Sequence, residues 1–227
     1  MPRKTPRSTV RRLPKRGHYD RATRDAILDE GLVAHVGFAV DGQAYVVPMS
    51  YARDGERLLL HGSVGSRMMR HLADGAEICV TVTLLDGLVL ARSQFHHSMN
   101  YRSVMAFGRV RAVTDVAEKR LALEKLVEHL VPGRAADSRE ASEQELAATE
   151  VIELPLDETS AKVRTGPPGD APADLQLGHW SGVIPLSLAP GTVEPAPDLA
   201  EGIAAPGYVT SYRRPDGTEI AGRRGQR

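Results

Sequence analysis

The feature that most constrains the fold is a run of short apolar segments, separated by tight turns, between residues 32 and 112. The segments LVAHVGFAV, AYVVPMSYA and RLLLHG follow one another with only DGQ and RDGE between their cores. Asp-Gly between two apolar segments is typical of a β-hairpin turn, because glycine adopts the positive φ that such turns need. Connections this short leave no room for crossover helices, so antiparallel strands are expected rather than a doubly wound parallel sheet.

Two strand segments carry irregularities. Pro48 lies inside AYVVPMSYA, and since proline cannot donate to a ladder, this strand should have an open edge or a bulge there. The segment EICVTVTLLDGLVLA is either a strand pair around its Asp-Gly or one long bent strand.

Several helices are expected around the strands. Asp20 is a potential N-cap for RATRDAILDE, and a short helix is expected from Ser66 to Gly75. The clearest helix is DVAEKRLALEKLVEHLV, because its leucines and valines supply an apolar face after the cap residue Asp115; a capping pattern at Ser142 predicts one more. About six antiparallel strands with these helices predict a mainly β protein, a β-barrel with helical decoration.

Composition narrows the class of protein. The chain has 227 residues with 29 basic and 29 acidic side chains, a balance that argues against a domain built chiefly for nucleic acid. No apolar run approaches the roughly 20 residues that span a bilayer, and the N-terminus lacks the apolar core of a signal peptide. The single cysteine, Cys79, excludes an intrachain disulfide and a multi-cysteine metal site. We therefore expect a cytoplasmic protein with no membrane partner and no metal.

The chain is expected to have three parts. Residues 1–17 form a basic tail, since seven Lys or Arg and no acid occur before Asp20. This tail is either a solvated flexible segment or an arm that touches a partner subunit or a polyanion. Residues 18–190 form one domain, and residues 191–227 form a C-terminal extension that is partly loop.

The end of the third strand segment points to a ligand. Polar, glycine and cationic residues crowd into seven positions there: His61, Gly62, Ser63, Gly65, Ser66 and Arg67. A helix start offers unpaired N–H groups, glycines let a ligand approach, and an arginine can grip a phosphate with two hydrogen bonds. The alternative is a plain capped helix with Ser66 as N-cap and Arg67 solvated. The stretch is neither a Walker loop nor G-x-G-x-x-G.

These segments, in this order, resemble the FMN-binding split β-barrel proteins. The resemblance lies in VVPMSYARDGERLLLHGSVGSRMMRHL, ICVTVTLLDGLVL, NYRSVMAFGRV, SAKVRTGPP and HWSGVIPL, and it covers residues 13–188. Within that fold the chain is most similar to the pyridoxamine 5′-phosphate oxidase-like family, in the branch that includes nitroimidazole-resistance proteins. The resemblance implies a six-stranded antiparallel split barrel that binds FMN, and a homodimer with its flavin sites between the subunits.

The resemblance also implies which residues contact FMN. The phosphate would lie at the turn, against His61, Gly62, Ser63, Ser66 and Arg67. The residues implied for the ring and its crevice are Pro48, Met49, Ser50, Tyr51, Asn100, Tyr101, Arg102, Ser103 and Trp180. Two alternatives stay open: residues 100–103 are an ordinary strand start, and Trp180 belongs to the core.

The implied function is an FMN-dependent oxidoreductase that reduces a small electrophile with electrons from a nicotinamide donor. No residue stands out as a dedicated acid, base or nucleophile, so no catalytic residue is assigned. His96 and His97 would point to opposite faces of a strand and are expected as polar rim residues. The vitamin-making oxidases end in an arginine- and histidine-containing segment with no match here, which argues against pyridoxamine phosphate as substrate. The alternative is a non-enzymatic haem, flavin or deazaflavin binder on the same fold.

Overall fold

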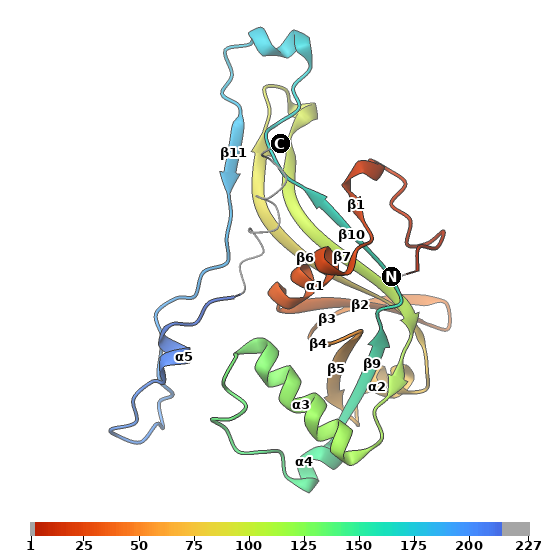
Figure 1. Cartoon of the computed structure of the whole chain (residues 1–227), viewed down its shortest axis with the longest axis vertical. Coiled ribbons are helices and arrows are strands. Elements are labelled where there is room, and N and C mark those ends of the chain that lie inside the picture. Colours follow the sequence, from red (N-terminus) through yellow and green to blue (C-terminus); the bar gives the residue numbers. More distant parts are fainter. Residues whose placement is uncertain (1–2, 215–227) are drawn as a thin grey trace.

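The computed structural model describes residues 3–214 and contains two antiparallel sheets (Figure 1). The larger sheet has the order β1 (Gly17–His18), β10 (Glu158–Arg164), β7 (Ser98–Arg109), β6 (Glu77–Leu90), β2 (Val33–Val40) and β3 (Gln43–Ser50), with β11 (Gly182–Pro185) also pairing with β6. The smaller sheet has the order β4 (Ala52–Asp54), β5 (Arg57–Ser63), β9 (Thr149–Pro155) and β8 (Arg111–Ala112).

Helices and helical turns connect and cover the strands. The α-helices are α1 (Arg21–Glu30), α2 (Arg67–Ala73), α3 (Val116–Leu130), α4 (Glu143–Ala148) and α5 (Gly207–Thr210). Three 3₁₀ turns are η1 (Pro14–Arg16), η2 (Gln94–His96) and η3 (Pro172–Gln176). Among the described residues, none of these helices has the length and apolar character to cross a membrane.

The mainly β class is confirmed, but the predicted number of six strands was wrong. The larger sheet alone has seven strands, four more form the second sheet, and the strand order in each sheet runs from one end to the other, so a closed barrel is not shown. The segment AYVVPMSYA, expected as one strand, divides at Tyr51 into β3 and β4, which belong to different sheets. Strands β1, β8 and β11 are only two to four residues long, too short to show a period of two.

The N-caps of the helices, which depend on residues close together in the sequence, were predicted correctly. Asp20 accepts a hydrogen bond from the Thr23 N–H at 2.9 Å, and Asp115 accepts one from the Glu118 N–H at 2.8 Å. Ser142 begins α4 with a complete capping box.

The long strand β6 is continuous, with an irregularity between Leu85 and Gly87, and Pro48 lies on β3 at the end of its sheet. Both strand irregularities therefore have the form expected.

The main core lies between the two sheets and beneath α1 and α2. In β6 the alternate residues Ile78, Val80 and Val82 are buried, as expected for a strand with one face on the core. Other members of the core are Ile27, Leu28, Val36, Tyr51, Leu58, Leu60, Met69, Leu72, Val104, Ile152 and Leu154. A smaller cluster around Ala122 and Leu126 packs α3 onto the second sheet.

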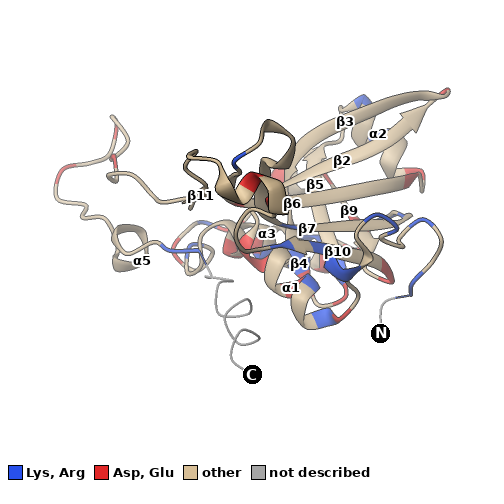
Figure 2. Ribbon diagram, turned by 90° about the horizontal axis from the view of Figure 1, so that it is seen from above, with Lys and Arg blue, Asp and Glu red and all other residues tan. Residues whose placement is uncertain are grey.

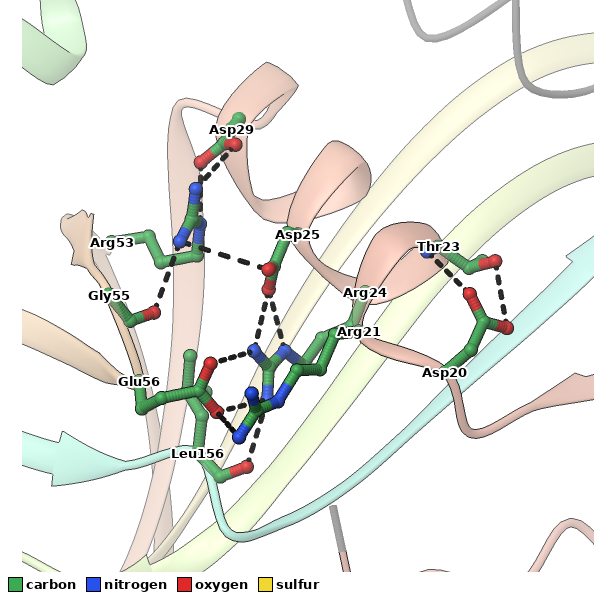
Figure 3. Close-up of polar contacts among 10 residues, drawn as sticks. All are labelled: Asp20, Arg21, Thr23, Arg24, Asp25, Asp29, Arg53, Gly55, Glu56 and Leu156. Carbon is green, nitrogen blue, oxygen red and sulfur yellow. Dashed lines mark hydrogen bonds and ion pairs between the residues drawn. The ribbon is translucent and has the colours of Figure 1, made fainter. Parts of the chain in front are cut away.

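A group of ion pairs fixes α1 to the turn after β4; we call it the α1 network (Figure 3). Its members are Arg21, Arg24, Asp25, Asp29, Arg53 and Glu56. Arg24 is only 1% exposed and pairs with Asp25 at 2.7 Å and Glu56 at 3.1 Å, and it also donates to the Leu156 carbonyl at 3.1 Å. Arg53 makes two hydrogen bonds of 2.7 Å to Asp29. Every guanidinium in this group has a carboxylate partner.

The terminal segments lie against the body in different ways. The N-terminal segment follows the larger sheet, where Arg7 pairs with Glu158 at 2.9 Å and β1 pairs with β10. After β11 the chain runs along the outside of the molecule, and between residues 182 and 207 it contains no Lys or Arg (Figures 1 and 2). Its end returns to α1, where Arg214 donates to the carbonyls of Asp29 and Glu30. The remainder of the predicted extension, 215–227, lies outside the described residues.

Candidate cofactor sites

The β5–α2 turn, residues 61–67, is a compact hydrogen-bonded structure. The Ser66 N–H donates to the Ser63 carbonyl at 2.9 Å, and the Gly65 N–H donates to Ser63 Oγ at 3.2 Å. Ser66 Oγ accepts a hydrogen bond from the Met69 N–H at 3.3 Å, so Ser66 is the N-cap of α2. The capped helix of the simpler interpretation is therefore present, and both hydroxyl groups keep a proton to donate.

The two glycines of this turn are needed for different reasons. A Cβ on Gly62 would lie 2.7 Å from Met69 Cγ, so Gly62 lets α2 pack onto β5. A Cβ on Gly65 would meet only Ser63 Oγ, at 3.5 Å, so the space beside Gly65 is open. Of the two, only Gly65 leaves the backbone accessible to a ligand.

The turn offers two unsatisfied groups. Arg67 is exposed, and its side chain forms no hydrogen bond or ion pair with the rest of the described chain. His61 is half-buried, and its buried Nδ1 has no partner among the described residues. Burial lowers the pKa of His61, so its imidazole is neutral near pH 7. Of the two, the exposed Arg67 guanidinium is the group that could grip a phosphate ester from solvent.

The residues predicted beside the ring fall into two groups on the β3–β4 segment. Pro48 is exposed on β3, and Met49 and Ser50 are half-buried beside it. Tyr51 is fully buried, and its hydroxyl donates to the Leu28 carbonyl at 2.6 Å. Burial raises the pKa of Tyr51 well above its ordinary value. The phenol therefore holds α1 to the sheets, whereas Pro48, Met49 and Ser50 lie at the sheet edge.

The predicted segment 100–103 on β7 has mixed surroundings. Arg102 is buried and pairs with Asp86 at 2.8 Å and with Glu30. Asn100 accepts a hydrogen bond from Arg164, and Ser103 Oγ donates to the Lys162 carbonyl at 3.3 Å. Tyr101 is the one member of this segment that lines a cavity.

Trp180 is 67% exposed, which excludes the core alternative. Its ring lies over Gly182, where a Cβ would come within 2.7 Å of it. Within one chain, Trp180 and the β5–α2 turn do not share a cavity with Tyr101.

A cavity of about 850 Å³ lies where η1, η2 and the end of β10 meet. We call it the β10 cavity; it is lined by Arg12, Leu13, Arg16, Phe95, His96, His97, Ser98, Tyr101, Lys162, Val163, Arg164, Thr165, Pro167 and Gly169. Four of these residues are Lys or Arg, and none is Asp or Glu. The nearby Asp170 is held by Arg92 at 2.6 Å. The cavity is therefore cationic without a carboxylate in its wall.

Arg164 is the most buried cation of the β10 cavity, at 8% exposed. It donates to Asn100 Oδ1 and to the carbonyls of Gly166 and Pro167, at 3.3 and 3.1 Å. All three partners are neutral oxygens, and the buried Nε has no partner among the described residues. Burial and the neighbouring Arg16 lower the pKa of Arg164.

Sequence reasoning did not identify this cavity. His96 and His97 were expected to point to opposite faces of a strand, but His96 ends η2, His97 follows it, and both line the cavity. One signal was present: Lys162 and Arg164 are two residues apart in a strand, which places them on one face. The described residues contain no group of three or more His, Cys, Asp or Glu that could hold a metal ion.

The chain thus combines two antiparallel sheets with a capped turn that carries an exposed arginine and with a separate cationic cavity. A family model described as pyridoxamine 5′-phosphate oxidase matches residues 20–163. The chain therefore belongs to the pyridoxamine 5′-phosphate oxidase-like family, as the sequence motifs indicated. No curated protein matches the chain.

Solved structures support this membership. The chain is similar to the flavocytochrome Anf3 from Azotobacter vinelandii, with 38% identity, a TM-score of 0.87, and coverage of 92% of this chain and 98% of that one. It is similar to a FAD and heme binding protein from Mycobacterium smegmatis, with 39% identity, a TM-score of 0.82, and coverage of 86% and 95%. A putative 5-nitroimidazole antibiotic resistance protein from Bacteroides thetaiotaomicron is 26% identical, with a TM-score of 0.54 and coverage of 65% and 86%.

Proposed function

We propose that this protein is a flavin-binding oxidoreductase that passes electrons from a nicotinamide donor to a small electrophile. The observation that carries the proposal is the unpaired Arg67 in the β5–α2 turn of a chain that belongs to this family. A bound flavin supplies hydride and single-electron chemistry. The protein's part is to bind and orient it: Arg67, Ser63 and Ser66 would donate hydrogen bonds to the phosphate, and His61 lies at the start of the same turn.

We propose FAD as the flavin, with FMN as the alternative that the sequence motifs favour. The support for FAD is the M. smegmatis relative, which binds FAD and is 39% identical over most of both chains. Both flavins carry the phosphate that the turn would hold, so the turn does not separate them. Release of the bound cofactor and its mass will do so.

A homodimer is part of the proposal. The outward faces of β2, β6 and β7 carry exposed apolar side chains, namely Val33, Leu85, Leu88, Met99 and Met105. Apolar side chains gathered on one face are typical of an interface. The family resemblance implies that such a dimer brings Pro48, Met49 and Ser50 of one subunit near the segment 100–103 of the other. A cytoplasmic location remains a prediction.

The test of the flavin site is Arg67→Ala. We expect this variant to bind flavin about 1–3 kcal/mol more weakly, the usual contribution of a charge-assisted hydrogen bond. Flavin content after purification and the flavin dissociation constant, from fluorescence quenching, measure the effect. Arg70→Ala is the matched control, because Arg70 is also exposed on α2 and also lacks a side-chain partner. Equal flavin affinity in the two variants would count against the turn as the phosphate site.

A second candidate function is haem binding in addition to flavin binding. It rests on the two relatives that are 38% and 39% identical, a flavocytochrome and a FAD and heme binding protein. The test is spectroscopic: a Soret band in the purified protein, or after hemin is added, supports it. A protein that retains flavin and takes up no hemin is a flavoprotein only.

A further inference from the structure

We propose that the β10 cavity binds the acidic edge of a planar aromatic ligand, with Arg16, Lys162 and Arg164 contacting its anionic groups. For a porphyrin ligand, this proposal rests on the proposed haem binding. It goes further because it names the residues that would contact the ligand. The shared chemistry is a flat aromatic ring joined to groups that carry two or more negative charges. A porphyrin with two carboxylates has it, and so does a nicotinamide dinucleotide with its phosphates.

The first argument is the uncompensated charge of the cavity. The side chains of Arg12, Arg16 and Lys162 form no hydrogen bond or ion pair with the described residues, and Arg164 bonds only to neutral oxygens. Elsewhere Arg24, Arg53, Arg57, Arg92 and Arg102 pair with carboxylates. The half-buried Arg214 donates to backbone carbonyls, but those carbonyls lie next to the acidic end of α1. Cations gathered in a concave site repel one another unless an anion joins them.

The second argument is that Arg164 is already oriented. Its guanidinium is fixed by Asn100, Gly166 and Pro167, and one buried N–H, on Nε, remains without a partner. None of its three partners offsets the charge of the guanidinium. An anion in the cavity would offset that charge.

The third argument is the aromatic and apolar part of the wall. Phe95 is 89% exposed and packs edge-on against His96, with ring centroids 5.2 Å apart. Tyr101 is half-buried, and Leu13 is exposed on the same cavity with a φ of 56°. Exposed rings beside cations suit a flat, acidic ligand better than a lone phosphate. The volume of about 850 Å³ lies within the range of sites for cofactor-sized ligands.

The cavity is separate from the proposed flavin site within one chain. None of its lining residues belongs to the β5–α2 turn. The two sites can therefore be tested independently in one protein.

The experiment uses the double variant Arg16→Ala, Lys162→Ala in the full chain, because both side chains are only half-buried and the fold does not need their charge. Its matched control is Arg11→Ala, Lys15→Ala, which removes two exposed cations of the same tail that do not line the cavity. Hemin is titrated and followed by the Soret band, NADH is titrated and followed by its fluorescence, and flavin content is measured in every preparation.

We expect at least a tenfold loss of affinity for one of the two probes in the cavity variant and none in the control. A loss for hemin identifies a carboxylated ring as the occupant, and a loss for NADH identifies a phosphorylated one. Equal affinities in variant and control, or no binding of either probe to the wild type, would overturn the inference. Flavin content separates the two claims: a colourless protein that still binds hemin through these cations refutes only the flavin function.

Discussion

Two arginine-rich regions lie at opposite ends of β10 and are built in opposite ways. The α1 network reaches the carbonyl of Leu156, just before β10 begins, through Arg24 (Figure 3). The β10 cavity surrounds Arg164, the last residue of the same strand. Arg24 and Arg164 are almost equally buried, yet Arg24 has two carboxylate partners and Arg164 has none.

The difference separates a contribution to stability from a contribution to binding. A buried guanidinium is costly to desolvate, and paired carboxylates within the chain offset that cost in the folded protein itself. At the β10 cavity the chain supplies only neutral oxygens, so the offsetting negative charge must come from outside. We therefore expect Arg24 to contribute to the stability of the fold, and we expect the proposed ligand to supply the negative charge that Arg164 lacks.

The largest expected effect is the loss of the network's central cation. Arg24→Ala removes contacts to Asp25, Glu56 and the Leu156 carbonyl, and it leaves a gap beneath α1. We expect the free energy of unfolding, from urea denaturation, to fall by about 3 kcal/mol, as for other broken buried pairs. Arg21→Ala is the control: its contact to Glu56, at 3.3 Å, is exposed, and its loss should cost about 0.5 kcal/mol or less. Equal losses would show that burial does not determine how much these ion pairs contribute to the free energy of unfolding.

Arg164→Met makes the comparison direct, because it removes a guanidinium that is also buried but lacks a carboxylate partner among the described residues. The variant leaves Asn100 Oδ1 and the Pro167 carbonyl without the Arg164 donor, whereas the Gly166 carbonyl still accepts from Asn100 Nδ2 at 3.2 Å. It also removes an uncompensated buried charge. We expect a loss of only about 1 kcal/mol in the free energy of unfolding in the absence of ligand, because an apolar group can replace a buried charge with little cost. Urea denaturation of ligand-free protein measures it. A loss as large as that of Arg24→Ala would mean that Arg164 is structural.

The pH dependence of stability should also come from the network. The Arg24 hydrogen bonds hold the pKa of Glu56 below its ordinary value of 4.5. The unfolded chain therefore binds the proton first, so this stabilisation is complete above about pH 4.5 and is lost as the pH falls through the folded pKa. Because Glu56 is half-exposed, the effect should stay below about 1 kcal/mol. Urea midpoints measured between pH 6 and pH 3 should fall less in Arg24→Ala than in the wild type, and parallel curves would contradict the assignment.

The comparison also shows which parts of the fold the sequence could predict. The N-caps Asp20, Ser66 and Asp115 were found because a cap involves residues two or three positions apart. The division of the strands between two sheets was not found, because the contacts made at the dividing residue, such as the hydrogen bond of Tyr51 to Leu28, join residues far apart in the chain. Contacts between residues that are far apart in the chain leave no periodic pattern in the sequence.

The same rule applies to the two candidate sites. The β5–α2 turn is one continuous stretch, so its residues could be recognised together. The β10 cavity is assembled from three segments, 12–16, 95–101 and 162–169, and none of them is unusual alone. From the sequence, Arg12 and Arg16 were predicted to belong to a basic tail, and His96 was predicted to be a polar rim residue. Only their convergence at the end of β10 shows that positive charge accumulates there without an acid.

The smallest expected change in stability would come from giving the cavity the acid that it lacks. Thr165 is exposed on the cavity wall, next to Arg164. Thr165→Glu would place a carboxylate among the cations, as Glu56 is placed in the α1 network. We expect the free energy of unfolding to rise by about 0.5 kcal/mol, the value of a partly exposed ion pair, and the affinity for whichever of hemin and NADH binds to fall. Thr165→Gln has nearly the same shape without the charge, so it should leave both quantities unchanged. If Thr165→Glu instead binds that probe as tightly as Thr165→Gln does, the cations do not act together on a ligand, and the contrast between the two ends of β10 is one of structure only.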